Sequence, residues 1–147
     1  MTRGYFAIGI ENGKDKQNIG TLWRSAHVFG AAFIFVIGRR YEKQAGDTTK
    51  AWRSIPLFHY ATFDQFYNHM PRDCQLVGIE LTDHATPINH VTHYERTIYL
   101  LGAEDHGLSC QAKAKVTQTI ILPGKYCLNV AVAGSIVMFD RIQKQND

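Results

Sequence analysis

The sequence predicts an α/β fold in which a mostly parallel sheet is flanked by helices. Several short runs rich in Ile, Val, Leu, Phe and Tyr are continuously apolar, which is typical of parallel strands covered on both faces. Segments with helical spacing of apolar residues lie between these runs, and such alternation favours a parallel sheet. The chain has 147 residues, 45% of them hydrophobic, which is enough for one core. We therefore expect a single domain over residues 1–147.

The strand-like runs are short and are separated by more polar segments. They cover residues 5–11, 31–38, 75–81, 97–102 and 118–123. The most polar stretch, residues 39–53, is predicted to be an exposed loop. No internal repeat, low-complexity tract or linker interrupts the pattern, which supports one domain.

The helix expected over residues 18–30 has the clearest boundaries. Asn18 is a suitable N-cap and Gly30 stands at the usual C-terminal stop. A second short helix is expected over residues 62–70. The apolar residues that define the two helices are Ile19, Leu22, Trp23, Ala26 and Phe29, and then Phe63, Phe66 and Tyr67.

The last helix, expected over residues 128–143, is apolar nearly all the way round between Leu128 and Phe139. A helix without a polar face has to be covered on more than one side. We expect it either to be threaded deep into the domain or to pack against a partner chain.

Charge and cysteine content indicate little about function. A formal net charge of +3 and a pI near 8.8 are a weak indication of a polyanionic partner. The N-terminus has no secretory signal pattern, and the longest apolar stretch, residues 28–38, is too short to span a bilayer. We therefore expect a cytoplasmic protein without a membrane partner. Its odd set of cysteines is expected to be reduced and buried: Cys74, Cys110 and Cys127.

The loop "LLGAEDHGLS" follows the strand expected over residues 97–102, at the sheet edge where ligands of such folds bind. It contains neither a GxGxxG fingerprint nor the Lys-Ser or Lys-Thr of a Walker A loop, so a phosphate cradle is not indicated. A glycine turn can instead bind a ligand through its main chain while Glu104 supplies a negative charge. The alternative is an ordinary strand-to-helix turn whose acids favour the helix dipole.

Three stretches together resemble motifs 1, 2 and 3 of the SpoU branch, also called the TrmH branch, of the SPOUT methyltransferases. They are "NIGTLWRSAHVFG", "LLGAEDHGLS" and "ILPGKYCLNVAVAGSIVMFD", in the order of the family and near its spacing. The resemblance covers essentially the whole chain. It implies a deep trefoil knot, here over about residues 81–147, although knots are otherwise almost absent from folds.

The resemblance also implies an activity and its partners. Proteins of this family bind S-adenosylmethionine in the knot, work as homodimers and methylate ribose 2′-hydroxyls of tRNA or rRNA. The short length of the chain is similar to that of members that act on tRNA, so tRNA is favoured over rRNA. No separate RNA-binding domain is expected, so the RNA has to lie on a basic surface of this domain and of a second subunit. Candidates for that surface are Arg3, Lys14, Lys16, Arg39, Arg40, Lys43 and Arg53.

Four residues match the catalytic positions of the family. The resemblance implies that Arg24 is the catalytic residue, with Asn18 beside it, and it also matches Glu104 and Asn129. Arginine stays protonated in proteins, so we expect Arg24 to hold the adjacent phosphate and stabilise the developing alkoxide rather than act as a base. The alternative for Arg24 is a solvated helix residue.

For the cofactor, the resemblance implies Leu81, Thr82, Gly102, Leu122 and Leu128, whose apolar surfaces and main chain suit an adenine slot. Many members of the family have serine where this chain has Cys127. Cys127 keeps the small size but is a weaker hydrogen-bond donor.

Seven histidines raise the possibility of a metal site, above all around His84, His90 and His93, but the segment lacks paired cysteines and no metal is expected. Two other functions stay open. One is a knotted RNA-binding protein with weak or lost methyltransferase activity, which the altered residue 127 supports. The other is a nucleotide-binding oxidoreductase, against which the missing phosphate fingerprint argues.

Overall fold

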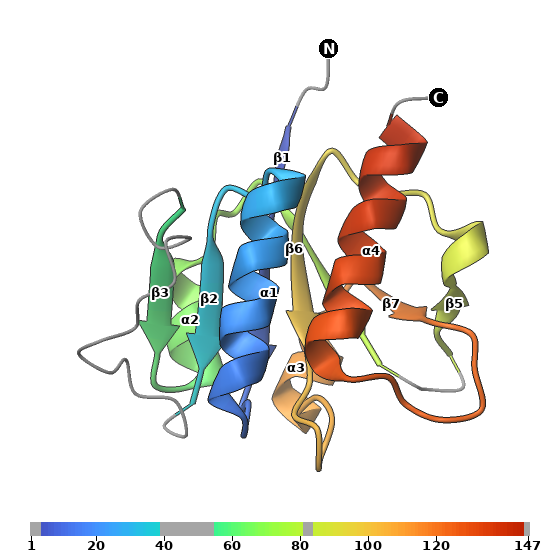
Figure 1. Cartoon of the computed structure of the whole chain (residues 1–147). Coiled ribbons are helices and arrows are strands. Elements are labelled where there is room, and N and C mark those ends of the chain that lie inside the picture. The colour runs from blue at the N-terminus through green and yellow to red at the C-terminus, as the bar shows by residue number, and fades with distance from the viewer. Residues whose placement is uncertain (1–3, 39–54, 81–83, 146–147) are drawn as a thin grey trace.

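A seven-stranded sheet forms the centre of the protein, seen in a computed structural model that describes residues 4–38, 55–80 and 84–145. Its strand order is β3-β2-β1-β6-β4-β7-β5, and every pair of neighbouring strands in it is parallel (Figure 1). The strands are β1 (Tyr5–Glu11), β2 (Ile34–Ile37), β3 (Leu57–Tyr60), β4 (Gln75–Ile79), β5 (Thr86–Pro87), β6 (Arg96–Leu101) and β7 (Gln118–Ile121). The predicted mostly parallel sheet is confirmed.

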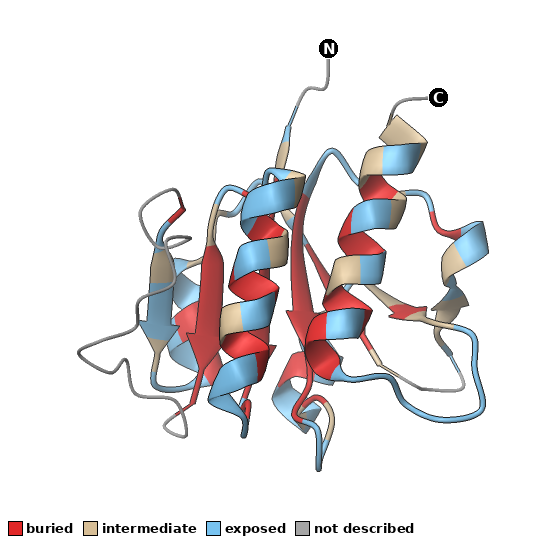
Figure 2. Ribbon diagram, in the orientation of Figure 1, coloured by how far each residue is buried: buried red, intermediate tan, exposed pale blue. Residues whose placement is uncertain are grey.

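Helices cover both faces of the sheet, as the continuously apolar strands predicted. The helices α1 (Lys16–Phe29) and α4 (Val130–Gln145) lie side by side on one face. The helices α2 (Phe63–His69) and α3 (Cys110–Lys115) pack on the other (Figure 1). A short 3-10 helix, η2 (Ile88–His90), follows β5. Figure 2 shows the buried residues concentrated along the central strands and on the sides of the helices that face them.

Strand β6 shows how one run of sequence contributes to both layers. Ile98 and Leu100 pack under α2 and α3, whereas Tyr99 and Leu101 pack under α1 and α4. Each fully buried aliphatic side chain of this kind contributes about 1.5–3 kcal/mol of transfer free energy. Because both alternating sets are buried, the strand carries no polar face.

Helix α1 begins before the predicted N-cap. Asp15 is the N-cap, and its carboxylate accepts a hydrogen bond from Gln17 N at 2.8 Å. Asn18 lies within the first turn and is buried, so its prediction as the cap is wrong. The predicted stop is confirmed, because Gly30 caps the C-terminus with a φ of 85°, which favours glycine.

Helix α4 is buried along one face only. Gly134 lets it approach α1, since a Cβ there would lie 2.6 Å from Leu22 Cδ1. On the outer face, Val132, Ile136 and Phe139 are exposed. Among residues 4–38, 55–80 and 84–145, nothing covers this outer apolar face of the helix.

Several short elements of the fold could not be predicted from apolar patterns in the sequence. Strands β3 and β5 and helix α3 were not predicted; they have four, two and six residues. The whole loop predicted over residues 39–53 lies outside the described residues, as do Leu81 and Thr82. The second predicted helix is confirmed, with Thr62 capping α2 through a hydrogen bond from Gln65 N.

A buried arginine fastens the C-terminal part of α4 to the segment before β6. Arg141 is 1% exposed. It donates hydrogen bonds of 2.8–3.1 Å to the Tyr94 and Glu95 carbonyls and to the Thr97 and Tyr99 hydroxyls. These acceptors replace the water that a buried guanidinium loses.

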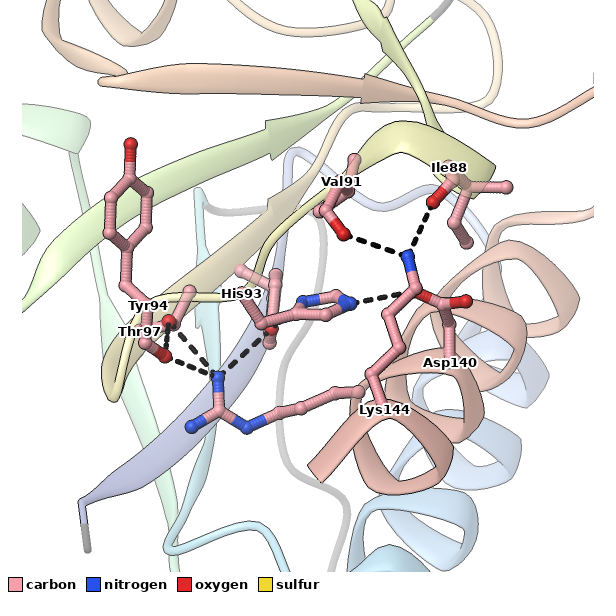
Figure 3. A network of polar contacts seen from close by, with 9 residues as sticks. Ile88, Val91, His93, Tyr94, Thr97, Asp140 and Lys144 are labelled. Atoms are coloured by element: carbon pink, nitrogen blue, oxygen red, sulfur yellow. Dashed lines mark hydrogen bonds and ion pairs between the residues drawn. The ribbon is translucent and has the colours of Figure 1, made fainter. Parts of the chain in front are cut away.

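A second cluster continues this fastening along the helix. His93 Nε2 lies 2.7 Å from Asp140 Oδ2, and its Nδ1 lies 2.6 Å from the Tyr99 hydroxyl. Lys144 pairs with the same Asp140 oxygen at 2.8 Å. Figure 3 shows that its ammonium also donates to two main-chain carbonyls, those of Ile88 and Val91. The C-terminal half of α4 is thus held by polar contacts as well as by apolar packing.

Candidate active site

Three polar side chains from distant parts of the sequence form a chain of hydrogen bonds at the carboxyl edge of the sheet. Asn129 Nδ2 donates to Asn18 Oδ1 at 2.8 Å, and Asn18 Nδ2 donates to Glu104 Oε1 at 2.7 Å. The Lys14 amide donates to Glu104 Oε2 at 3.1 Å. Glu104 accepts at both oxygens, so each amide side chain has a fixed orientation.

Asn129 also begins helix α4. Its Oδ1 accepts from the backbone N–H groups of Ala131 and Val132 at 2.9 and 3.2 Å, as an N-cap does. The same side chain therefore starts the helix and holds Asn18. Asp15 thus caps α1, the role that was expected of Asn18, and Asn129 caps α4.

Glu104 stays ionised well below neutral pH. Burial alone would raise the pKa of this carboxyl, but hydrogen bonds from its own backbone amide, from Asn18 and from the Lys14 amide outweigh burial and lower the pKa. Glu104 is therefore an acceptor at neutral pH and organises its donors, rather than serving as a source of a proton.

Two glycines let the loop after β6 fold back on itself. Ala103 and Gly107 exchange backbone hydrogen bonds of 2.8 and 3.2 Å. A Cβ on Gly102 would lie 2.3 Å from the Gly107 carbonyl carbon, and Gly107 has a φ of 69°. The turn therefore requires glycine at both positions, and it presents Glu104 toward α1.

Two further acids hold the end of this loop, and the sequence reasoning missed both. Glu80 Oε1 accepts from the Leu108 amide at 2.8 Å. Glu11 accepts from the amide and the hydroxyl of Ser109, each at 2.7 Å, and Ser109 caps α3. Their positions could have indicated them, because Glu11 ends strand β1 and Glu80 directly follows strand β4, as Glu104 follows β6.

A cavity opens between the carboxyl ends of β4, β6 and β7 and the first turn of α4. Five of the predicted site residues line it: Gly102, Glu104, Leu122, Cys127 and Leu128. Asn18 and Asn129 meet Glu104 beside the cavity without lining it. The predicted Leu81 and Thr82 lie outside the described residues.

The cavity combines apolar walls with one carboxylate oxygen that lacks a hydrogen bond. The walls are formed by Ile79, Leu101, Ile120, Leu122, Leu128 and Val130. Glu80 Oε2 is buried and has no hydrogen-bond partner in the described part of the chain, although the Lys113 ammonium lies 3.8 Å away. Such a site suits a ligand with a flat apolar group and hydrogen-bond donors.

Arg24 is not gathered with the other predicted catalytic residues. It is exposed, and it has no hydrogen bond or ion pair to any other described residue. Six residues of α-helix place it roughly 120° around α1 from Asn18. It shares an exposed helix face with Thr21 and Val28, next to the uncovered apolar face of α4.

The cysteines and histidines differ in part from the expectations. Cys110 and Cys127 are exposed free thiols, so the prediction that they are buried is wrong; Cys74 is partly buried and also free. Among residues 4–38, 55–80 and 84–145, no group of three His, Cys, Asp or Glu side chains could hold a metal ion. Both ring nitrogens of His93 are taken by Tyr99 and Asp140.

The surface properties add two observations. No helix in the described ranges has the length and apolar character that crossing a bilayer requires. Lys14 and Lys16 are exposed at the start of α1, as an RNA-facing surface needs. The other candidates for that surface lie outside the described residues: Arg3, Arg39, Arg40, Lys43 and Arg53.

Comparison with known proteins places this geometry in a family. Residues 5–139 match the model of the SpoU rRNA Methylase family. The tRNA (guanosine(18)-2′-O)-methyltransferase of Escherichia coli K12 is 23% identical over 146 residues, which cover 95% of this chain and 64% of that protein. This chain therefore spans about two thirds of the length of the curated relatives it matches.

Solved structures share the fold. AviRb of Streptomyces viridochromogenes, a SpoU methyltransferase solved with AdoMet, is 20% identical with a TM-score of 0.86, covering 100% of this chain and 60% of AviRb. A TrmH/SpoU tRNA modifying enzyme of A. aeolicus is 18% identical with a TM-score of 0.83, and the match covers 99% of this chain and 78% of that enzyme. These likenesses support the α/β architecture described above.

Proposed function

Because the chain belongs to the SpoU rRNA Methylase family, we propose that it transfers a methyl group from S-adenosylmethionine to a ribose 2′-hydroxyl of RNA, with tRNA as the substrate. The observation that carries the proposal is the meeting of Asn18, Glu104 and Asn129 beside a cavity at the carboxyl edge of the sheet. The E. coli relative, a tRNA 2′-O-methyltransferase, supports the choice of tRNA.

The cavity fits S-adenosylmethionine by its donor and acceptor pattern. Leu122 and Leu128 provide apolar surface for an adenine ring, and Gly102 leaves main chain accessible. Glu80 Oε2 accepts no hydrogen bond from the described residues and has only the Lys113 ammonium at 3.8 Å, so it provides an acceptor for a donor of the cofactor. The cofactor when bound supplies an activated methyl group on a sulfonium.

Side chains of the protein hold the RNA and assist removal of the proton from the ribose 2′-hydroxyl. Arg24 stays protonated, so it holds the phosphate beside the reacting ribose and stabilises the hydroxyl oxygen as its proton passes to that phosphate. Glu104 and Asn129 hold Asn18, which lies at the start of the helix that carries Arg24. S-adenosylmethionine held in the cavity would supply the methyl group that this oxygen receives.

A homodimer is part of the proposal, with the outer face of α4 as the contact between copies. Val132, Ile136 and Phe139 are exposed on α4, and Val28 is exposed on α1 beside them. A shallow groove lined by three of these four residues, with Thr21, runs between the two helices. Arg24 lies on the same face, so a second copy packed there is adjacent to Arg24. Replacing Ile136 with Asp should convert the dimer to a monomer in light scattering.

The single domain over residues 1–147 and the knot over about residues 81–147 belong to the same proposal. The chain leaves β7, which lies between β4 and β5, and then begins α4 against α1. A crystal structure that traces residues 81–83 together with residues 122–129 tests the threading, and an unthreaded path would exclude the knot.

Two measurements test the activity. Calorimetry with S-adenosylmethionine and S-adenosylhomocysteine should show one site per chain. Mapping of 2′-O-methyl groups in total RNA from cells with and without the protein should show a position that loses its methyl group. Replacement of Arg24 with Ala should abolish transfer and leave cofactor binding intact, and continued turnover would remove Arg24 from the mechanism.

A second candidate function is an RNA-binding protein that has lost the transfer reaction. Cys127, in place of the family serine, lines the cavity and favours this candidate, because a thiol is a weaker hydrogen-bond donor than a hydroxyl. Absence of calorimetric binding for both cofactor forms, together with retained RNA affinity, would select this function over the enzyme.

A further inference from the structure

The loop between β7 and α4 carries a highly exposed aromatic side chain. All residues from Pro123 to Asn129 are exposed, and Tyr126 is 86% exposed. Tyr126 also lines the cavity, and most of its surface lies in solvent. An aromatic ring held in this way offers a flat apolar face to a ligand outside the cavity.

A turn begins this loop, and hydrogen bonds hold its other end. Gly124 turns the chain with a φ of 143°, next to the restricted backbone of Pro123. At the other end Asn129 is held by Asn18 and by the first turn of α4. Tyr126 therefore lies on a short segment between a glycine turn and the held first residue of α4.

Exposed lysines lie next to residues that line the same cavity. Lys125 precedes Tyr126, Lys14 donates its backbone amide to Glu104, and the Lys113 ammonium lies 3.8 Å from Glu80 Oε2. They come from three different elements: the β7–α4 loop, the β1–α1 loop and helix α3. Of the two cavity carboxylates, Glu104 has both oxygens hydrogen-bonded and Glu80 is paired with Lys113.

We propose that Tyr126 is a stacking platform for an unpaired base of the RNA substrate, while Lys14, Lys113 and Lys125 contact the phosphates on either side. An aromatic ring among cations is the pattern with which proteins bind single-stranded nucleic acid, because every base has a face to stack and every nucleotide has a phosphate. The inference rests on the proposed function and assigns a site for the substrate rather than for the cofactor.

The inference specifies the conformation of the RNA. Bases in an A-form duplex are stacked on one another, so their faces are not available to Tyr126. The protein should therefore bind a nucleotide in a loop or single strand in preference to the same nucleotide in a duplex. Lys14, Lys113 and Lys125 contact phosphates in both forms and give no such preference.

The test compares RNA affinities of the full-length protein at fixed low salt. The probes are a single-stranded oligoribonucleotide of mixed sequence and the duplex that it forms with its complement. Replacement of Tyr126 with Ala should weaken single-strand binding about tenfold and leave duplex binding nearly unchanged. Tyr126→Phe and Tyr126→Trp should retain single-strand affinity, because stacking does not need the hydroxyl.

Two control variants separate stacking from other effects. Tyr94→Ala removes a tyrosine before β6, at the opposite edge of the sheet, and should bind both RNAs like the wild type. Lys125→Gln should weaken both RNAs alike and reduce the slope of log affinity against log salt by about one. S-adenosylhomocysteine affinity, measured by calorimetry, should stay within about twofold in the Tyr94→Ala and Lys125→Gln variants, because neither residue lines the cavity.

Each contrary outcome has a definite meaning. A Tyr126→Ala protein that binds the single strand like the wild type would overturn the inference. So would loss of S-adenosylhomocysteine affinity with RNA affinity unchanged, because Tyr126 would then be part of the cofactor site. A wild-type protein that binds S-adenosylhomocysteine but shows no preference for the single strand would reject this inference and keep the proposed function. A wild type that binds no S-adenosylhomocysteine would reject the methyltransferase itself.

Discussion

The two ends of helix α4 differ in how completely the polar groups around them are hydrogen-bonded. Toward the C-terminus, Arg141 is 1% exposed and donates hydrogen bonds to four different residues. At the N-terminus, Asn129 is exposed and borders a cavity in which Glu80 Oε2 accepts no hydrogen bond from any described residue. The saturated end stabilises the fold, whereas the incomplete end has acceptors to offer a ligand. One helix therefore contributes to stability near its C-terminus and borders the candidate site at its N-terminus.

The largest effect is expected at the saturated end. Replacing Arg141 with Ala removes four hydrogen bonds and opens a cavity, although Thr97 and Tyr5 still donate to the Tyr94 and Glu95 carbonyls. We expect the free energy of unfolding to fall by about 3–5 kcal/mol in urea titrations. Folded Arg141→Ala protein should bind S-adenosylhomocysteine normally, and a selective loss of ligand affinity would contradict the separation.

A smaller effect is expected for Asn129, where the cap and the link to Asn18 can be separated. Asn129→Ala removes both and should lower the free energy of unfolding by about 1–2 kcal/mol. Asn129→Asp keeps an oxygen for the helix amides but presents no donor to Asn18. We expect Asp to retain the stability measured by urea and to lose methyl transfer. Equal activity of Asn129→Asp and the wild type would show that the link is dispensable.

The ionisation of Glu104 should make a modest, pH-dependent contribution. Its pKa is lowered in the folded chain, so the unfolded chain binds a proton first as the pH falls. The stabilisation is complete above the ordinary value of 4.5 and is lost as the pH falls through the folded pKa. The difference in urea midpoint between wild type and Glu104→Gln should therefore shrink on acidification. A difference that grows would mean that folding raises the pKa of Glu104 instead of lowering it.

The smallest effect is expected from His93. Burial lowers its pKa, although Asp140 opposes the shift and Lys144 and Arg141 add to it. The folded state favours neutral imidazole, so stability should decline as the pH falls below 6.5, where the unfolded chain takes up the proton. His93→Gln should flatten that decline in thermal melts between neutral and mildly acidic pH. A profile as steep as that of the wild type would assign the decline to other groups.

How much the sequence predicts depends on whether a feature is local. The central strands β1, β2, β4, β6 and β7 were predicted because continuous apolar runs record burial on both faces. Strand β3 was missed since it is a short edge strand whose middle residues, Phe58 and His59, are exposed. The start of α1 was predicted at Asn18 instead of Lys16, because Asp15 caps the helix three residues earlier and patterns alone do not rank two good caps.

The candidate site was predictable only through the resemblance to a family. Asn18 and Glu104 are 86 residues apart, and Asn18 and Asn129 are 111 apart, so no local spacing relates them. Their meeting follows from the strand order, which places the ends of β1 and β6 side by side and α4 against α1. Glu80 and Glu11 were missed because an acid at the end of an apolar strand gives no sign of which amide it will bind.

The double role of Asn129 has a consequence for biosynthesis. The side chain that starts α4 also fixes Asn18, so docking of the last helix and completion of the site are one event. A ribosome makes α4 after the strands and helices that precede it in the chain. A nascent chain that lacks α4 leaves Asn18 without that partner and the cavity without one wall, Val130 and Ala133. Completion of the cavity therefore waits for synthesis and docking of this helix.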